Sequence, residues 1–110
     1  MKINKSLLSG STGMLVLSIL QGGDKYGYEM IQTLSLLSEN VFDMKEGTLY
    51  PVLHTLEKEG MLRGYEMETE QGRRRRYYHL TDKGRRQLAE QQEEWKAFSG
   101  AVNAVMQMGV

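Results

Sequence analysis

The sequence predicts a mainly α, α+β fold in which three short helices, a two-stranded hairpin and one long C-terminal helix follow one another. Apolar residues recur at helical spacing in three segments before residue 60, and a turn containing Gly72 separates two strand-like segments. No helix-breaking residue interrupts the segment from Thr81 to Gly100. A chain of 110 residues is long enough for one compact domain with one projecting element.

The first two predicted helices span about residues 14–21 and 28–38. Ser11-Thr12 can cap the first, whose nearly continuous apolar sequence indicates burial on most sides. That segment is too short to cross a bilayer and has no signal-peptide cleavage pattern, so we expect a core helix of a cytoplasmic protein. After the break at residues 22–24, the second helix has an apolar stripe formed by Met30, Ile31, Leu34 and Leu37.

The third predicted helix spans about residues 47–59, and Gly60 follows as its C-cap. Its apolar stripe consists of Leu49, Val52, Leu53 and Leu56. Pro51 is the only proline of the chain, and a proline fits a helix best in its first turn. We therefore expect the helix to start near Gly47 or Thr48.

Two strands are predicted next, over residues 62–70 and 73–80, with Gln71-Gly72 as the turn between them. Both segments are rich in Tyr, Met and Thr and alternate partially between polar and apolar residues. Three helices followed by a two-stranded ribbon make up a winged helix-turn-helix.

The last predicted helix begins at Thr81-Asp82 and continues to Gly100 or as far as Gly109. At ~1.5 Å per residue it is about 40 Å long, too long to be covered by its own lobe. A second copy of the chain is the natural cover for its apolar stripe, so we expect a homodimer. Residues 1–80 would then form the winged-helix domain, and residues 81–110 the dimerisation helix. The predicted dimer interface consists of Leu88, Trp95, Phe98, Val102, Val105 and Met106.

Four consecutive arginines, Arg73 to Arg76, are the strongest charge feature in a chain whose net charge is zero. Because side chains alternate along a strand, two of them should face each side of the ribbon, leaving at least two free for DNA phosphates or a minor groove. The alternative is that they pair across the ribbon with Glu66, Glu68 and Glu70.

Polar residues of the third helix form a second candidate surface. Its apolar stripe leaves Thr48, Tyr50, Pro51, His54 and Lys58 facing solvent. Hydroxyl, phenol and imidazole groups near a helix N-terminus suit contacts in a DNA groove, and the alternative is an ordinary solvated face.

The sequence contains no pattern typical of catalysis or metal binding. Cysteine is absent, and His54 and His79 have no neighbouring ligands at metal-binding spacing. No serine has a recognisable base partner, and no glycine-rich phosphate loop follows a strand. We therefore predict neither an enzyme, nor a cofactor, nor a metal site.

Trp95 is the only tryptophan, and two interpretations of it remain open. It can be an anchor in the dimer core. Alternatively, Trp95 and its symmetry mate wall a cavity between the protomers, where a flat apolar ligand could stack.

Three motifs give the chain a family resemblance. Residues 47–53 read Gly-Thr-Leu-Tyr-Pro-Val-Leu, followed by Leu56-Glu57 and by Gly-Met-Leu at 60–62. Residues 26–29 read Tyr-Gly-Tyr-Glu, and residues 75–81 read Arg-Arg-Tyr-Tyr-His-Leu-Thr, with Gly84 after them. In this order and spacing, over about residues 15–84, they resemble the PadR family of bacterial transcriptional regulators.

The resemblance implies a ligand-responsive repressor of a neighbouring transporter or detoxification gene, which binds a near-palindromic operator in double-stranded DNA as a homodimer. The short length and single C-terminal helix are similar to a subfamily in which that helix swaps onto the partner, and some members bind planar aromatic drugs between paired tryptophans. The competing hypothesis is a winged helix that binds protein, which would suit the zero net charge but would leave the arginine cluster unexplained.

Two sets of residues follow from these patterns and this resemblance. The predicted DNA-binding set is Lys25, Tyr26, Lys45, Thr48, Tyr50, Pro51, His54, Arg73, Arg74, Arg75 and Arg76. The predicted effector-binding set is Leu7, Gly10, Met14, Trp95 and Phe98.

Overall fold

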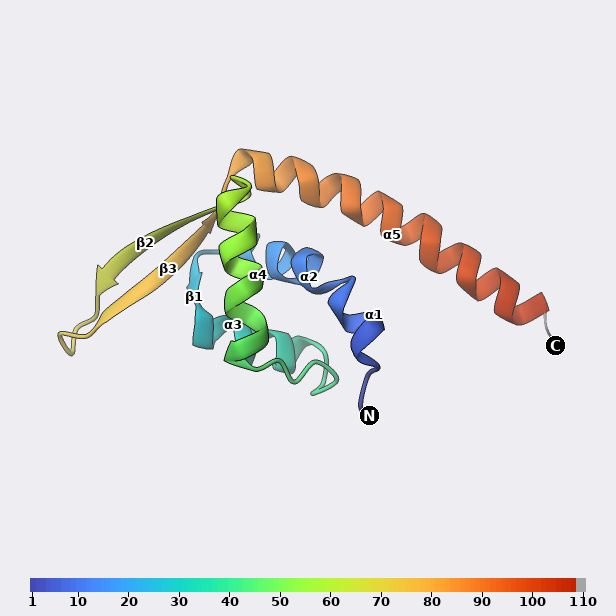
Figure 1. Cartoon of the computed structure of the whole chain (residues 1–110), viewed down its shortest axis with the longest axis horizontal. Coiled ribbons are helices and arrows are strands. Elements are labelled where there is room, and N and C mark those ends of the chain that lie inside the picture. Colours follow the sequence, from blue (N-terminus) through green and yellow to red (C-terminus); the bar gives the residue numbers. More distant parts are fainter. Residues whose placement is uncertain (109–110) are drawn as a thin grey trace.

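The computed structural model describes residues 1–108 and contains the predicted winged helix-turn-helix with its long last helix (Figure 1). The elements in chain order are α1 (Lys5–Ser9), α2 (Thr12–Leu20), β1 (Lys25–Tyr26), α3 (Gly27–Leu37), α4 (Glu46–Lys58), β2 (Leu62–Glu68), β3 (Arg74–Leu80) and α5 (Asp82–Met108). Helices α2, α3 and α4 form the lobe, and β2 and β3 form the wing that projects from it.

The sheet is antiparallel and has the strand order β1-β3-β2. Strand β1 was not predicted, because two residues are too few to show a periodicity. It pairs Lys25 with Tyr78 and Tyr26 with Tyr77, on the edge of β3 that β2 leaves open. The wing turn closes through the Thr69 N–H, which donates to the Arg73 carbonyl at 2.8 Å. Strand β3 begins at Arg74, so Arg73 is the last residue of the turn, which corrects the expected strand start by one residue.

The core lies between the three lobe helices, the inner face of the sheet and the start of α5. The residues with almost no exposed surface are Val16, Leu17, Leu20, Met30, Leu49, Leu53, Leu80 and Leu88. The inclusion of Leu88 in the dimer interface was wrong, because the first turns of α5 pack on α2 and leave Leu88 1% exposed. Leu37 was expected on the buried stripe of α3, yet it is 72% exposed at the C-terminal end of that helix.

Two features of the helices differ from the expectation. Helix α4 begins at Glu46, so Pro51 lies beyond the first turn, and the helix lacks the hydrogen bond that an N–H at this position would donate to the Gly47 carbonyl. Helix α1 was not predicted; it ends at Ser9, with Gly10 as its C-cap, before the predicted helix begins as α2. Leu7 and Met14 consequently belong to different elements.

Thr81 anchors the start of α5 to the turn between α4 and β2. Its N–H donates to the Met61 carbonyl at 3.1 Å, and its hydroxyl donates to the Gly60 carbonyl at 2.7 Å. The Gly84 N–H donates back to the Thr81 hydroxyl at 3.0 Å, which satisfies one of the free amides at the helix start. The direction in which α5 leaves the lobe is thus set by backbone contacts.

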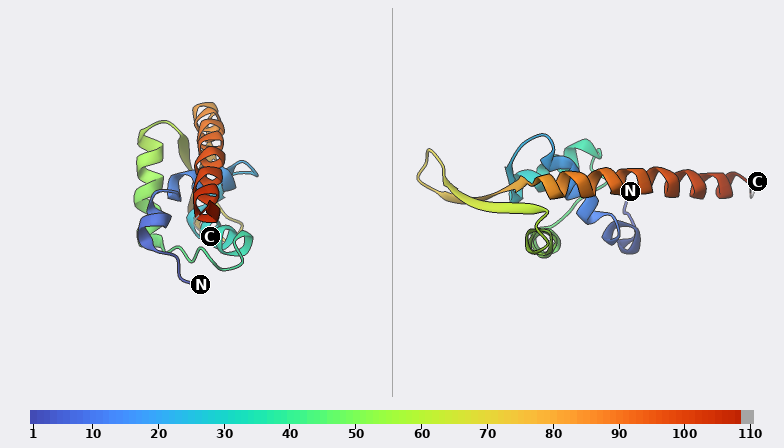
Figure 2. Two further views of the ribbon diagram at one scale, coloured as in Figure 1. Left: turned by 90° about the vertical axis from the view of Figure 1, so that its right-hand side faces the viewer. Right: turned by 90° about the horizontal axis from the view of Figure 1, so that it is seen from above.

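Helix α5 runs past the lobe, and its C-terminal half lies clear of the other elements (Figures 1 and 2). The described chain measures 59 × 30 × 21 Å along its principal axes, and the wing and α5 extend in opposite directions along the long one. Among the described residues, no helix combines the length and apolar character that crossing a membrane requires.

Candidate nucleic-acid interface

Helix α4 presents a continuous polar face to solvent. Leu49, Leu53 and Leu56 are buried against the lobe, while the predicted residues Thr48, Tyr50, Pro51 and His54 are all exposed. The 3.6-residue period produces this division, because the buried leucines recur at spacings of four and three. The two flanks of the exposed face differ. Tyr50 and His54 point toward the wing, whereas Pro51 borders a shallow apolar groove with Gly13 and Val52.

A hollow of about 520 Å³ separates α4 from the wing. Its lining from α4 consists of Tyr50, His54, Glu57 and Lys58, and its lining from β3 consists of Arg76 and Tyr78. Aromatic rings and cationic groups from two elements therefore border one open space.

Tyr50 connects α4 to the start of α3. A Cβ atom placed on Gly27 would lie 2.6 Å from the Tyr50 hydroxyl oxygen, so the absence of a side chain at Gly27 makes room for the phenol. Burial raises the pKa of Tyr50 above its ordinary value of 10.0, and the nearby Glu46 raises it further. Tyr50 remains 45% exposed and can still contact a ligand as a neutral donor.

The four arginines lie in four different environments, which corrects the expectation of two on each side of the ribbon. Arg73 is exposed in the turn, and Arg74 pairs with Glu66 at 3.0 Å. The Arg75 guanidinium lies 4.3 Å from the ring centroid of Tyr26, on the outer face of the sheet. The Arg76 guanidinium pairs at 2.7 Å with Glu57 of α4, an acidic residue outside the ribbon.

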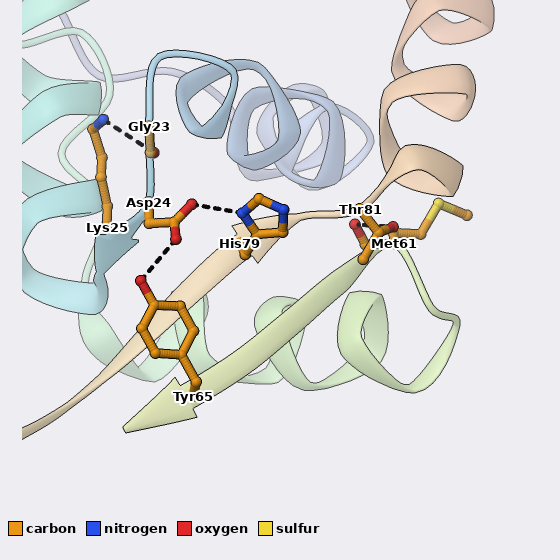
Figure 3. A network of polar contacts seen from close by, with 7 residues as sticks. All are labelled: Gly23, Asp24, Lys25, Met61, Tyr65, His79 and Thr81. Carbon is orange, nitrogen blue, oxygen red and sulfur yellow. Dashed lines mark hydrogen bonds and ion pairs between the residues drawn. The ribbon is translucent and has the colours of Figure 1, made fainter. Parts of the chain in front are cut away.

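A polar network on the outer face of the sheet was not foreseen from the sequence. Asp24 directly precedes β1, and its carboxylate connects the other two strands: one oxygen lies 2.8 Å from Nδ1 of His79, and the other accepts a hydrogen bond of 2.7 Å from the Tyr65 hydroxyl (Figure 3). Asp24 is 41 positions from Tyr65 and 55 from His79 in the chain, so no local sequence pattern could have predicted the contacts.

The network changes the pKa values of two of its members. Burial alone would raise the pKa of Asp24, but the hydrogen bonds from Tyr65 and His79 outweigh it and lower the pKa from its ordinary value of 3.8. The hydrogen bond to Asp24 raises the pKa of Tyr65 above 10.0. Asp24 therefore stays ionised and ties the segment before β1 to both strands of the wing.

Comparison with known proteins decides the family. The family model described as "Transcriptional regulator PadR-like family" matches residues 16–90, which is more than half of the chain. This chain belongs to the PadR-like family of transcriptional regulators. The resemblance inferred from the sequence motifs is confirmed, and so is the expectation of a transcriptional regulator rather than an enzyme.

Relatives of this PadR-like chain match it over nearly its whole length. An uncharacterized protein from Lysinibacillus sphaericus is 30% identical over 105 residues, covering 96% of each chain. The crystal structure of a PadR-like transcriptional regulator from Bacillus cereus is 33% identical, with a TM-score of 0.81, and the match covers 94% of this chain and 98% of that one. A transcriptional regulator from Clostridium thermocellum is 31% identical, with a TM-score of 0.83 and coverage of 90% and 96%.

The remaining predicted DNA-binding residues of this PadR-like protein lie at the starts of α3 and α4. Tyr26 is the N-cap of α3, and its half-buried ring packs edge-on against Tyr77 at a centroid distance of 5.5 Å. Lys25 is half-buried in β1. Lys45 is the N-cap of α4, and its ammonium group lies 3.2 Å from the carboxylate of Asp43. Lys45 is exposed at the N-terminus of α4.

The predicted dimer and effector residues of α5 lie on its projecting part. Trp95 is 48% exposed, Phe98 60%, Val105 72% and Met106 66%. Trp95 and Phe98 are close to each other, with ring centroids 6.2 Å apart. Leu7 of α1 is also 70% exposed, while Met14 of α2 is half-buried against the core. Among the described residues, no cluster of three potential metal ligands occurs.

Proposed function

We propose that this PadR-like regulator is a cytoplasmic homodimeric repressor that binds near-palindromic double-stranded DNA. In this proposal α4 enters the major groove, and the wing reaches the flanking backbone or minor groove. The observation that carries the proposal is that the polar face of α4 and the arginine-bearing wing border one hollow. A duplex lying across the mouth of that hollow would meet both elements at once.

The residues divide by the kind of contact that each can make. Thr48, Tyr50 and His54 offer hydroxyl and imidazole groups that suit base edges. Arg73 and Arg74 lie at the far end of the wing, and Lys45 lies at the N-terminus of α4, positions that suit phosphate groups. Base contacts would supply sequence specificity, and phosphate contacts would supply most of the affinity.

The exposed stripe of α5 supports the homodimer. Trp95, Phe98, Val102 and Val105 alternate at heptad positions and are open to solvent in the single chain. Large apolar side chains gathered on one projecting helix indicate an interface. A second copy related by a two-fold axis would cover the stripe and present two reading helices to half-sites about 34–36 Å apart.

We further propose that the dimer interface holds a planar aromatic effector. The exposed Trp95 ring, with Phe98 beside it, offers a stacking surface that a two-fold axis would duplicate. Leu7, Gly10 and Met14 would complete the lining. An effector there would alter the distance between the two α4 helices of the dimer and weaken operator binding. Transcription of a neighbouring transporter or detoxification gene would then increase.

A salt titration of DNA binding tests the main proposal. The protein should retard DNA from the region upstream of its own gene more strongly than random DNA, with log affinity falling linearly with log salt concentration. Arg73→Ala with Arg74→Ala should reduce that slope by about 0.9 for each phosphate that the protein no longer neutralises. The matched control is Arg85→Ala with Arg86→Ala, which removes two exposed arginines from the start of α5. Equal slopes for the two double variants would contradict the role of the wing.

Sedimentation tests the dimer. Phe98→Asp with Val102→Asp should yield monomers, because two negative charges per chain would be buried at the seam. Asn103→Asp with Gln107→Asp adds the same charge at heptad positions that face away from the seam, and it should stay dimeric. A stable dimer of the first variant would refute this mode of assembly.

Tryptophan fluorescence tests the effector site, because Trp95 is the sole tryptophan. Planar aromatic dyes should quench its emission with one ligand per dimer and a Kd on the order of micromolar. Trp95→Ala should abolish the loss of operator binding that the dye causes. Absence of quenching by any planar dye, with loss of the dimer in Trp95→Ala, would identify Trp95 as a core anchor.

A further inference from the structure

The carboxylate of Glu57 joins the predicted reading helix to both strands of the wing. Its Oε2 atom accepts a hydrogen bond of 2.7 Å from Nη2 of Arg76 in β3. The same oxygen accepts a hydrogen bond of 3.3 Å from the backbone N–H of Gly64 in β2. One acidic side chain near the end of α4 thus contacts the two strands independently.

Gly64 makes this arrangement possible. A Cβ atom at this position would lie 2.5 Å from Nη2, 2.7 Å from Cζ and 2.9 Å from Nε of Arg76. The guanidinium group therefore covers the glycine, crossing β2 on its way to α4. Any larger residue at position 64 would occupy the space that the guanidinium takes.

The pairing also sets the charge of this part of the wing. The side chains of Glu57 and Arg76 are 31% and 45% exposed, so water screens the pair only in part. Burial would lower the pKa of Arg76, but the Glu57 carboxylate and Tyr78 outweigh it and raise the pKa. Arginine is a cation in proteins in any case, and here the ion pair with Glu57 balances its charge.

We propose that Glu57 is a positioning residue, which fixes the wing relative to α4 and keeps Arg76 away from DNA phosphates. This inference rests on the proposed DNA binding. Helix α4 and the wing would touch different parts of a duplex, so operator recognition requires a fixed separation between them. Arg73 remains for phosphate contacts, and so does Arg74, whose pair with Glu66 is 73% exposed on the arginine side and easily exchanged. Arg76, in the less exposed pair, sets the geometry.

Glu57→Gln distinguishes this role from a simple loss of packing. Glutamine is close in size to glutamate and keeps an acceptor oxygen but carries no charge, so the charge of Arg76 is no longer balanced beside the proposed duplex. The variant should therefore bind random DNA more tightly, with a salt slope steeper by about 0.9 for each protomer that contacts DNA. Its preference for operator over random DNA should fall about tenfold, because the neutral amide holds the wing less firmly than the carboxylate does.

Two further variants complete the experiment. Glu59→Gln removes an equal charge two residues away, from an exposed residue at the end of α4, and serves as the matched control. Gly64→Ala keeps every charge but places a methyl group where the guanidinium lies, so it should reproduce the loss of preference. Thermal unfolding of each variant checks that it is folded at the assay temperature.

The outcomes separate the inference from the function on which it rests. If Glu57→Gln and Glu59→Gln have equal salt slopes and equal operator preference while the unmodified protein binds its operator, the positioning role is refuted. If the unmodified protein shows no salt-dependent DNA binding, the proposed function itself fails. The Gly64 amide resonance, measured without DNA, should shift in Glu57→Gln and stay in place in Glu59→Gln, and an unmoved resonance in both would refute the contact.

Discussion

Gly84→Ala should destabilise the protein even though alanine is a better helix former than glycine. Gly84 lies in the first turn of α5, where a Cβ atom would collide with the backbone carbonyl of Met61 and lie 2.7 Å from Cδ1 of Leu80. The Met61 carbonyl cannot move away freely, because it accepts the N–H of Thr81 at 3.1 Å. Accommodating the methyl group therefore requires moving the start of α5 away from the turn between α4 and β2.

The magnitude follows from two opposing terms. Overpacking of a well-packed site costs about 1–3 kcal/mol, and this contact is with backbone, so we expect the upper part of that range. Replacing glycine by alanine in a helix recovers up to about 1 kcal/mol, and less near a helix end. The net loss in the free energy of unfolding is about 2 kcal/mol, or roughly 8–16 °C in Tm.

Gly100→Ala is the matched control, because Gly100 lies in the same helix and a Cβ atom there would meet nothing within 4 Å. It should raise the stability by about 0.5–1 kcal/mol. Thermal and urea unfolding followed by circular dichroism would measure both variants, at one protomer concentration because dimerisation contributes to stability. A Gly84→Ala protein as stable as the unmodified one would refute the close approach of α5 to Met61.

Two other substitutions test the core and the polar network. Leu88→Ala should lower the free energy of unfolding by about 2–5 kcal/mol and leave the oligomeric state unchanged at a permissive temperature, because Leu88 belongs to the core of its own protomer. Dissociation of the dimer without loss of protomer stability would show that Leu88 belongs to the interface instead. Asp24→Asn should cost about 1 kcal/mol at pH 7, a value reduced for partial exposure. Because folding lowers the pKa of Asp24 from 3.8, the carboxylate stabilises the folded protein above that pH, and this stabilisation is lost as the pH falls below it. The unfolding free energy of Asp24→Asn should therefore depend less on pH in that acidic range. An unchanged pH dependence would contradict the network.

Local signals in the sequence determined most of the elements. The spacing of Leu49, Leu53 and Leu56 predicts both the existence of α4 and the face that it exposes, because a helix brings residues three and four apart onto one side. Gly72 adopts φ 77° in the wing turn, a conformation that glycine accepts readily, so the hairpin position was also readable. The exposed heptad of α5 from Trp95 to Val105 followed from the same periodicity.

The boundaries of the elements, and elements of only a few residues, were harder to predict from the sequence. Strand β1 has two residues and exists because β3 has an open edge beside it, which is a property of the assembled sheet. Leu37 shares the period of the α3 stripe, but that stripe extends past the end of the core. Periodicity specifies which residues share a face, while the extent of the neighbouring elements specifies how much of the face is covered.

Only the tertiary structure decided what the charged and polar side chains do. Four adjacent arginines look equivalent in the sequence, yet one lies in a turn, one pairs across the ribbon, one covers Tyr26, and Arg76 reaches Glu57, which is 19 positions away in the chain. The same holds for Asp24, His79 and Tyr65, and for Leu88, whose period fits either a dimer seam or a core. The physical reason is that helix and strand periods arise from backbone geometry within a few residues, whereas ion pairs, hydrogen bonds and burial depend on distances in space that the fold alone establishes.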